Sequence, residues 1–197
     1  MQITYTKDAL NQLLLNHDYL VVIDIEHTCT ADGSIPPHER EIIEIGAILV
    51  STKNLTIVSG VTEFNAFVSP EKHPTLSQFC SELTGISQSQ VMKAENFSQV
   101  FNDFKIWLPE ENSYIFSCWG GYDLIQINID CTKHNLEEFN PATVINLKKA
   151  FAKTQQLKTQ VGLRRALELS GVNLEGTQHR AIYDARNTVK LLPQIFR

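Results

Sequence analysis

Two carboxylates, Asp24 and Glu26, lie at the end of an apolar run that spans residues 19–23. Residues two apart on a strand point to the same face, so the two carboxylates are expected to converge there. Like charges that are held close together raise each other's pKa unless a cation lies between them. A divalent metal ion is the simplest partner for such a pair, so the spacing predicts a metal site at the end of this strand.

Three residues far downstream are candidates for the same site. Asp123 follows the Gly120-Gly121 turn at the expected start of a helix, and Asp184 borders the apolar stripe of a later helix, five residues after His179. Taken singly, Asp123 could be an ordinary acid favoured by the helix dipole, and His179 a surface histidine. Four carboxylates and one histidine together predict metal-assisted phosphodiester chemistry.

The composition indicates one globular domain over residues 1–197, because 43% of the residues are hydrophobic and only seven are prolines. No apolar run approaches the roughly 18 residues that cross a bilayer, and the first residues do not resemble a signal peptide. We therefore expect a cytoplasmic protein with no membrane partner. The four cysteines form no Cys-x-x-Cys pair and are expected to be reduced thiols, with only Cys29 near the acid pair.

The formal net charge of −5 argues against broad, nonspecific binding of duplex nucleic acid, which requires many contacts from basic residues to phosphates. The segment 139–167, however, contains no Asp or Glu and several basic residues. This segment is either a solvated basic helix face or a surface that guides a nucleic-acid strand. Its basic residues are Lys148, Lys149, Lys153, Lys158, Arg164 and Arg165.

The apolar periodicity predicts a mixed, five-stranded sheet with helices on both faces, which is an α/β fold. Strands are expected at residues 19–24, 42–50 and 56–68, joined as an antiparallel meander by short connections, and at 114–118 and 142–145. A short helical stripe is expected within residues 1–16. Two short helices are expected at 75–83 and 87–91. Further helices are expected at 96–108, 122–134, 146–152, 161–170 and 180–192, with Asn96 as a helix cap.

The order Asp24-x-Glu26, Asp123, His179-x-x-x-x-Asp184 resembles the DEDD exonucleases of the histidine subclass, which have a ribonuclease-H-like fold. Flanking motifs look like those of the enhanced-RNAi type of 3′-to-5′ exoribonuclease, and the resemblance covers about residues 18–195. One departure is Gly121, where the family pattern has an aspartate. The flanking motifs are Asp24-Ile-Glu26-x-Thr28-Cys29, Glu41-Ile-Ile-Glu44-Ile-Gly46-Ala47, Phe79-Cys80, Leu83-Thr84-Gly85-Ile86, Ser117-Cys-Trp119-Gly-Gly-Tyr122-Asp123 and Asn146-Leu147-Lys148.

The resemblance implies that the four carboxylates bind two Mg²⁺ or Mn²⁺ ions. Asp24 would bridge the ions, Glu26 and Asp184 would hold the ion on the nucleophile side, and Asp123 would support the other. His179 would be the general base. Carboxylate oxygens suit hard divalent cations, and two ions can stabilise both the attacking and the leaving oxygen.

Substrate contacts are expected from Thr28, Cys29 and Trp119, which lie in the matching motifs. Phe79 and Leu83 either pack into the core, which their apolar stripe favours, or lie against the terminal base, as aromatic platforms do. Glu41 and Glu44 flank the second strand and are expected to be solvated or to support the acids from behind.

The resemblance implies a 3′-to-5′ exoribonuclease that acts on single-stranded or frayed 3′ ends and releases nucleoside 5′-monophosphates. A DNA exonuclease of the same family stays open as an alternative, because the choice depends on contacts to the 2′-hydroxyl. A noncatalytic nucleic-acid-binding module on the same fold is a second alternative. The expected partners are therefore single-stranded RNA or DNA 3′ ends.

Overall fold

The computed structural model describes residues 3–60 and 62–196 and contains one mixed sheet, with strand order β3-β2-β1-β4-β5. β1, β2 and β3 pair antiparallel, whereas β4 and β5 run parallel to β1. The predicted five-stranded mixed sheet is confirmed. The strands are β1 (Tyr19–His27), β2 (Ile42–Ser51), β3 (Glu63–Phe67), β4 (Tyr114–Cys118) and β5 (Val144–Asn146).

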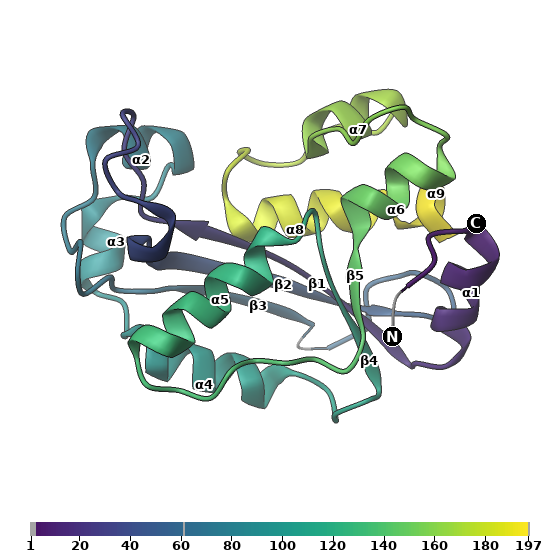
Figure 1. Cartoon of the computed structure of the whole chain (residues 1–197), viewed down its shortest axis with the longest axis horizontal. Helices are drawn as coiled ribbons and strands as arrows, with labels where there is room; N and C mark the ends of the chain where they lie inside the picture. The colour runs from purple at the N-terminus through teal and green to yellow at the C-terminus, as the bar shows by residue number, and fades with distance from the viewer. Residues whose placement is uncertain (1–2, 61, 197) are drawn as a thin grey trace.

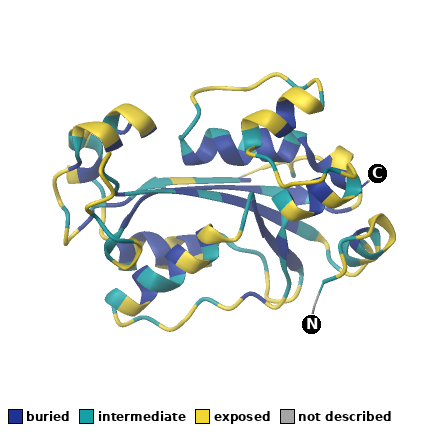
Figure 2. Cartoon of the chain, turned by 45° about the horizontal axis from the view of Figure 1, so that its top comes forward, coloured by how far each residue is buried: buried dark blue, intermediate teal, exposed yellow. Residues whose placement is uncertain are grey.

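Helices cover both faces of the sheet, as predicted (Figure 1). One face is covered by α4 (Phe97–Trp107) and α5 (Tyr122–Lys133). The opposite face is covered by α1 (Lys7–Leu15), α6 (Leu147–Thr154), α7 (Leu163–Leu169), α8 (Ala181–Lys190) and α9 (Leu192–Phe196). The short helices η1 (Pro37–Glu39), α2 (Gln78–Thr84) and α3 (Gln88–Met92) lie beyond the end of the sheet at which β1 terminates. Buried residues line the inner sides of these layers in Figure 2.

β1 lies in the middle of the sheet and alternates between two apolar cores. Leu20 and Val22 belong to the core beneath α8, whereas Val21 and Ile23 belong to the core beneath α4 and α5. Asp24 and Glu26 continue the first of these two series, because side chains alternate along a strand. The strand therefore delivers both carboxylates to the α8 side of the sheet, where the core ends.

Among the element boundaries that differ from the predictions are those of β3 and of the final helix. β3 begins at Glu63 rather than at residue 56, because the chain between them pairs only irregularly with β2 and turns at Gly60, whose φ is 110°. The expected final helix is divided into α8 and α9 at Leu191, and Pro193 in the first turn of α9 cannot donate a backbone hydrogen bond. Residues 1–2 and 61, which fall within the predicted first helical stripe and third strand, lie outside the described residues.

Local details of α4 agree with the prediction from sequence. Oδ1 of Asn96 accepts a hydrogen bond from the backbone N–H of Gln99 at 3.0 Å, so Asn96 caps the helix.

The four cysteines are free thiols, and Cys29 is the least buried of them. None of the helices among the described residues has the length and apolar character needed to cross a membrane.

Candidate active site

The acid pair of β1 is placed beside β2 by the strand register. Asp24 lies opposite Gly46, and Glu26 lies opposite Glu44, after which a bulge shifts the pairing between Glu26 and His27. Both carboxylates of β1 are half-buried, so their charges are only partly hydrated. The predicted convergence of Asp24 and Glu26 at the end of β1 is therefore present.

Gly46 allows α8 to lie directly on the sheet at this point. A Cβ atom at Gly46 would lie 2.3 Å from the backbone nitrogen of Ile182, which no folded chain accommodates without moving the helix. The close approach brings the first turn of α8, which contains Asp184, over the acid pair. The absence of a side chain on β2 thus helps to complete a site formed by β1 and α8.

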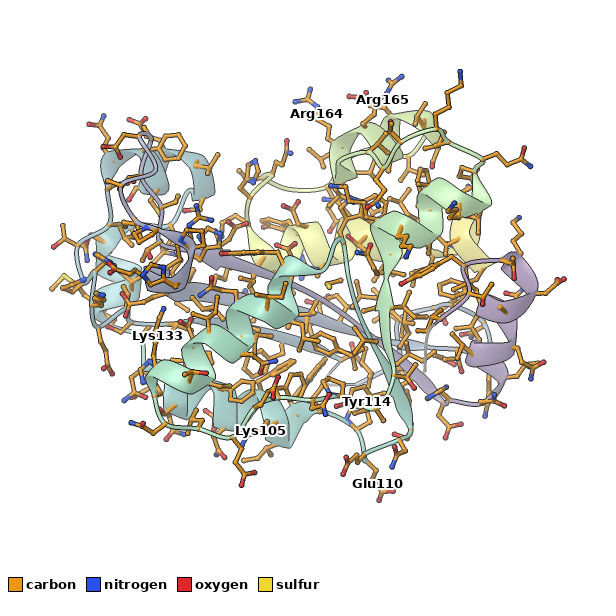
Figure 3. All side chains as sticks on the ribbon, viewed as in Figure 1. Lys105, Glu110, Tyr114, Lys133, Arg164 and Arg165 are labelled. Atoms are coloured by element: carbon orange, nitrogen blue, oxygen red, sulfur yellow. The ribbon has the colours of Figure 1, made fainter. Side chains whose placement is uncertain are left out.

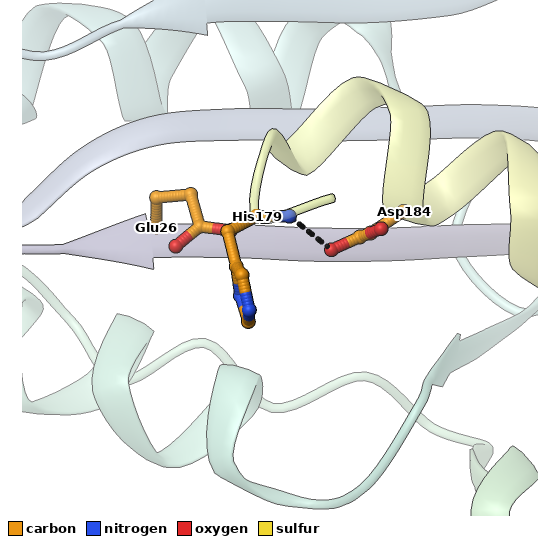
Figure 4. A group of neighbouring side chains, drawn as sticks. All are labelled: Glu26, His179 and Asp184. Carbon is orange, nitrogen blue, oxygen red and sulfur yellow. Dashed lines mark hydrogen bonds between the residues drawn. The ribbon is translucent and has the colours of Figure 1, made fainter. Parts of the chain in front are cut away.

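Asp184 contacts the backbone of His179 in the loop before α8. Oδ2 of Asp184 accepts a hydrogen bond from the backbone N–H of His179 at 3.0 Å, as Figure 4 shows, and His179 has a left-handed backbone with φ of 61°. Ligand atoms of Glu26, His179 and Asp184 all lie within 4.8 Å of one another. The carboxylate of Asp184 therefore fixes the backbone of the loop before α8, from which the His179 ring lies beside Glu26.

The fourth carboxylate, Asp123, lies buried in the first turn of α5. Burial raises the pKa of Asp24, and the charges of Asp123, Glu26 and Asp184 raise it further. Burial likewise raises the pKa of Glu26 to about 9, with contributions from the charges of Asp184 and Glu44. The four carboxylates predicted from the sequence therefore share one electrostatic environment, in which their negative charges repel one another.

This donor set fits a divalent metal ion. Oδ1 of Asp184 is buried and has no hydrogen-bond partner among the described residues, which is costly for a carboxylate oxygen. Burial raises the pKa of Asp184 as well, so the charged form lacks sufficient compensation from the protein alone. Hard cations bind carboxylate oxygens, and an ion at this position would supply both the missing ligand contact and the missing positive charge.

Glu44 is fully buried behind Glu26 and is bound by Arg180. The guanidinium donates from Nη2 to Oε1 at 2.9 Å and from Nε to Oε2 at 3.0 Å, and Ala181 N–H donates to Oε2 at 3.0 Å. Of the two expectations for this residue, solvation is wrong, and support of the acids from behind agrees with its position. Arg180 follows His179 directly, but no pattern in the sequence relates it to Glu44, which is 136 positions away.

Glu41 is also buried, with 4% of its surface exposed, so the expectation of a solvated side chain is wrong here too. Its carboxylate accepts hydrogen bonds from three consecutive backbone N–H groups, at residues 71–73, over 2.7–2.8 Å. Its own backbone pairs with Thr28 in both directions, at 2.8 and 3.0 Å. Glu41 and Thr28 therefore close the neck of the loop that follows the acid strand.

Among the predicted substrate contacts, Phe79 and Leu83 lie on one side of α2, four residues apart. Their exposed fractions are 40% and 36%, so the alternative that they pack into the core is wrong. An exposed aromatic and an exposed aliphatic side chain on one helix face form a surface against which a base can lie. A substrate contact by these two residues stays a prediction.

The other three predicted contacts are less accessible. Thr28 is 2% exposed, and its hydroxyl accepts the Glu41 N–H. The carbonyl of Cys29 accepts the Ser77 hydroxyl at 2.6 Å, which joins this segment to the start of α2. The ring of Trp119 packs against Phe151, with centroids 5.7 Å apart, and its buried indole N–H has no partner among the described residues. These residues have structural contacts, and their contact with substrate stays a prediction.

The basic segment 139–167 contributes exposed side chains to α6 and α7. Figure 3 shows Arg164 and Arg165 projecting outward from α7, at the top of the view. Both form ion pairs with Glu168 on the same helix, at 3.4 and 3.1 Å, so their charges are partly balanced. These two arginines fit a solvated helix face, and a role of the remaining lysines in guiding a strand stays a prediction.

Comparison with known proteins relates this site to a family. The profile of the exonuclease family RNase_T matches residues 21–192, which include all four carboxylates and His179. The chain belongs to the RNase_T exonuclease family. The sequence-based assignment to the DEDD 3′-to-5′ exonucleases of the histidine subclass is thereby confirmed.

Named relatives of this RNase_T exonuclease include two human exoribonucleases. It is 32% identical over 204 residues to human ERI1 exoribonuclease 2, which covers 91% of this chain and 28% of that protein. It is also 32% identical over 184 residues to human 3′-5′ exoribonuclease 1, which covers 89% of this chain and 51% of that protein. The chain thus spans about half the length, or less, of these relatives.

Solved structures of related exonucleases have the same fold. The nuclease domain of 3′hExo, a DEDDh family member bound to rAMP, superposes with a TM-score of 0.79 at 32% identity, covering 90% of this chain and 92% of that one. A 3′-exonuclease in 3′-end specific recognition of a histone mRNA stem-loop gives a TM-score of 0.80 at 28% identity, covering 91% and 64%. The expected ribonuclease-H-like exonuclease fold is confirmed by these neighbours.

Proposed function

We propose that this chain is a metal-dependent 3′-to-5′ exoribonuclease that hydrolyses single-stranded or frayed 3′ ends to nucleoside 5′-monophosphates. The observation that carries the proposal is the convergence of the four carboxylates Asp24, Glu26, Asp123 and Asp184 beside His179. Oδ1 of Asp184 is buried there and has no hydrogen-bond partner within the described part of the chain. Similarity to proteins named exoribonucleases favours RNA over DNA.

In the proposed reaction, the residues of the chain have separate tasks. The four carboxylates would hold two divalent ions, Mg²⁺ or Mn²⁺, which when bound stabilise the attacking and leaving oxygens of the phosphodiester. His179, held beside Glu26 by the contact of its backbone with Asp184, would accept the proton of the attacking water. A positioned base of this kind contributes about 10²–10⁴-fold to the rate.

The proposed substrate is a strand whose 3′ end enters between β1, α2 and α5. The exposed side chains of Phe79 and Leu83 would lie against the terminal base, and Trp119, Thr28 and Cys29 would border the same end. We also propose that the protein is located in the cytoplasm.

The deciding experiment compares RNA and DNA strands of one sequence, labelled at the 5′ end, with Mg²⁺, with Mn²⁺ and with chelator. We expect stepwise shortening of the linear RNA and release of 5′-monophosphates, dependent on the metal. A circular RNA of the same sequence should remain intact, because it has no 3′ end. Faster degradation of the DNA would favour the DNA exonuclease, and binding without products under all metal conditions would favour the noncatalytic module.

A further inference from the structure

The backbone of Arg40 is held against α5, the helix that contains Asp123. Its carbonyl oxygen accepts hydrogen bonds from Nε2 of Gln126 at 2.8 Å and from Nζ of Lys133. Gln126 is fully buried, and Lys133 lies at the far end of α5 (Figure 3). The segment between η1 and β2, where Arg40 lies, is therefore fixed relative to α5, whose first turn contributes the carboxylate of Asp123.

The side chain of Arg40 extends to the residue that precedes Asp123. Its Nη1 lies 3.5 Å from the hydroxyl of Tyr122, whose ring packs edge-on against His27 with centroids 5.5 Å apart. Tyr122 directly precedes Asp123, and His27 directly follows Glu26. The contact between the two rings therefore joins the chain neighbours of two of the four carboxylates. Nε of Arg40 is buried and has no hydrogen-bond partner among the described residues, which leaves a charged donor without an acceptor.

Among the described residues, no carboxylate pairs with Arg40, in contrast to three neighbouring basic side chains. Three neighbouring cations form ion pairs at 2.8–2.9 Å with acidic residues. No such pair involves Arg40 within the described parts of the chain. The three paired cations are Arg180, Lys72 and Lys133.

A strand that reaches the four carboxylates carries a negative phosphate at every nucleotide. Bound divalent ions compensate the charge at the scissile phosphate, but neighbouring phosphates still require positive partners in a protein whose net charge is −5. A guanidinium is suited to this role because its planar N–H groups can donate in pairs to phosphate oxygens.

We propose that Arg40 binds a phosphate of the substrate strand beside the carboxylate site, with Tyr122 orienting its guanidinium. The proposal rests on the exonuclease function proposed above and adds a binding residue to it. The Nε donor would gain an acceptor from the phosphate, and the single positive charge would contribute one contact to the strand.

The experiment measures equilibrium binding of a fluorescent, single-stranded RNA to the full chain in chelator, so that the strand is not cut, over a series of salt concentrations. Arg40→Gln is compared with Lys53→Gln, which removes the same charge. Lys53 is an exposed residue after β2, at the opposite end of the sheet, where Ser51 pairs with Tyr19. Both variants keep the backbone contacts of Arg40, and melting temperatures check their folding.

For Arg40→Gln we expect about fivefold weaker binding at about 0.1 M salt, and a salt dependence of log K that is shallower by about 0.7, as for one lost phosphate contact on a single strand. Lys53→Gln should bind as the unsubstituted chain does. Arg40→Lys should keep the salt dependence, because its charge remains, and lose part of the affinity, because the paired donors are gone.

Equal affinity and salt dependence of Arg40→Gln and Lys53→Gln would overturn the proposal, as would absence of RNA binding by the unsubstituted chain. A lysine variant with the salt dependence of the glutamine variant would also contradict it. The proposed nuclease function is judged separately. If RNA binding depends on Arg40 while neither Mg²⁺ nor Mn²⁺ yields products, hydrolysis is wrong and the phosphate contact stands.

Discussion

Glu26 and Glu44 lie opposite each other on β1 and β2, yet among the described residues a cation pairs only with Glu44. Arg180 binds both oxygens of Glu44, whereas Glu26 has a pKa raised to about 9 by burial and by the charges of Asp184 and Glu44. On the two strands, Glu44 is thus already paired with a cation, whereas Glu26 remains available to bind a metal ion.

The buried pair of Glu44 and Arg180 should be essential for stability. Arg180→Met leaves the carboxylate of Glu44 buried without a counter-ion, which should lower the free energy of unfolding by about 3–5 kcal/mol. Adding Glu44→Gln removes the unpaired charge and should recover most of this loss. Urea denaturation of the single and double variants measures both effects, and a double variant no more stable than Arg180→Met would contradict this explanation.

The stability of the metal-free protein should fall as the pH rises from about 4.5 towards about 9. The Glu26 carboxyl titrates near 4.5 in the unfolded chain and near 9 in the folded one, so the folded state holds more protons in this interval. The free energy of unfolding then decreases with increasing pH. Melting temperatures in chelator should show the decrease, and saturating Mg²⁺ should remove it. A melting temperature that rises over this interval in chelator would refute it.

Asp184→Asn should abolish metal binding while preserving the fold. The amide oxygen can still accept the His179 N–H, but the charge that holds a divalent ion is lost. We expect at least about 100-fold lower nuclease activity and no increase of the melting temperature on addition of Mg²⁺. Asp103→Asn is the matched control, because Asp103 is exposed on α4, and its response to Mg²⁺ should equal that of the unsubstituted chain.

His179→Ala tests whether the histidine acts as a base or as a metal ligand. If His179 is the base, the variant should lose about 10²–10⁴-fold of the activity, while Mg²⁺ still raises the melting temperature. Both roles are compatible with ligand atoms that lie within 4.8 Å of Glu26 and Asp184. Loss of the Mg²⁺-dependent increase would assign His179 to metal binding instead.

Gly46→Ala should displace α8 from the sheet. The new methyl group would lie 2.3 Å from the backbone nitrogen of Ile182, and neither backbone can move independently of its element. We expect a loss of about 1–3 kcal/mol in the free energy of unfolding and weaker metal binding, because Asp184 moves with the helix. Gly162→Ala, which adds a methyl group in open space, should cost less than about 1 kcal/mol. Equal losses in both variants would contradict the steric explanation.

The elements that carry the site could be predicted from sequence because each has a local signal. The acid pair follows an apolar strand at a spacing of two, Asp123 follows a Gly-Gly turn, and Asp184 borders an apolar helical stripe. Such patterns are governed by neighbours in the chain, so the strand and helix periodicities were sufficient to place these residues at the ends of their elements.

The supporting contacts could not be predicted, because they join residues that are distant in the sequence. Arg180 binds Glu44 across 136 positions, and no periodicity relates the two. Glu41 binds backbone N–H groups of residues 71–73, a contact that has no side-chain signal in the partner segment. The first half of the expected third strand is wrong because the chain forms only an isolated bridge with β2 at Ile57 and then turns at Gly60.

The two hydrogen bonds between Thr28 and Glu41, one of which uses the Thr28 hydroxyl, also bear on how chains of this family can diverge. These contacts close the neck of the loop between β1 and β2, while the tip at residues 31–34 is exposed. Lengthening a closed loop costs only about 0.6 kcal/mol per doubling, provided that its ends stay fixed. The tip can therefore accept inserted residues at little cost in stability, while the acid strand on the other side of the neck keeps its geometry.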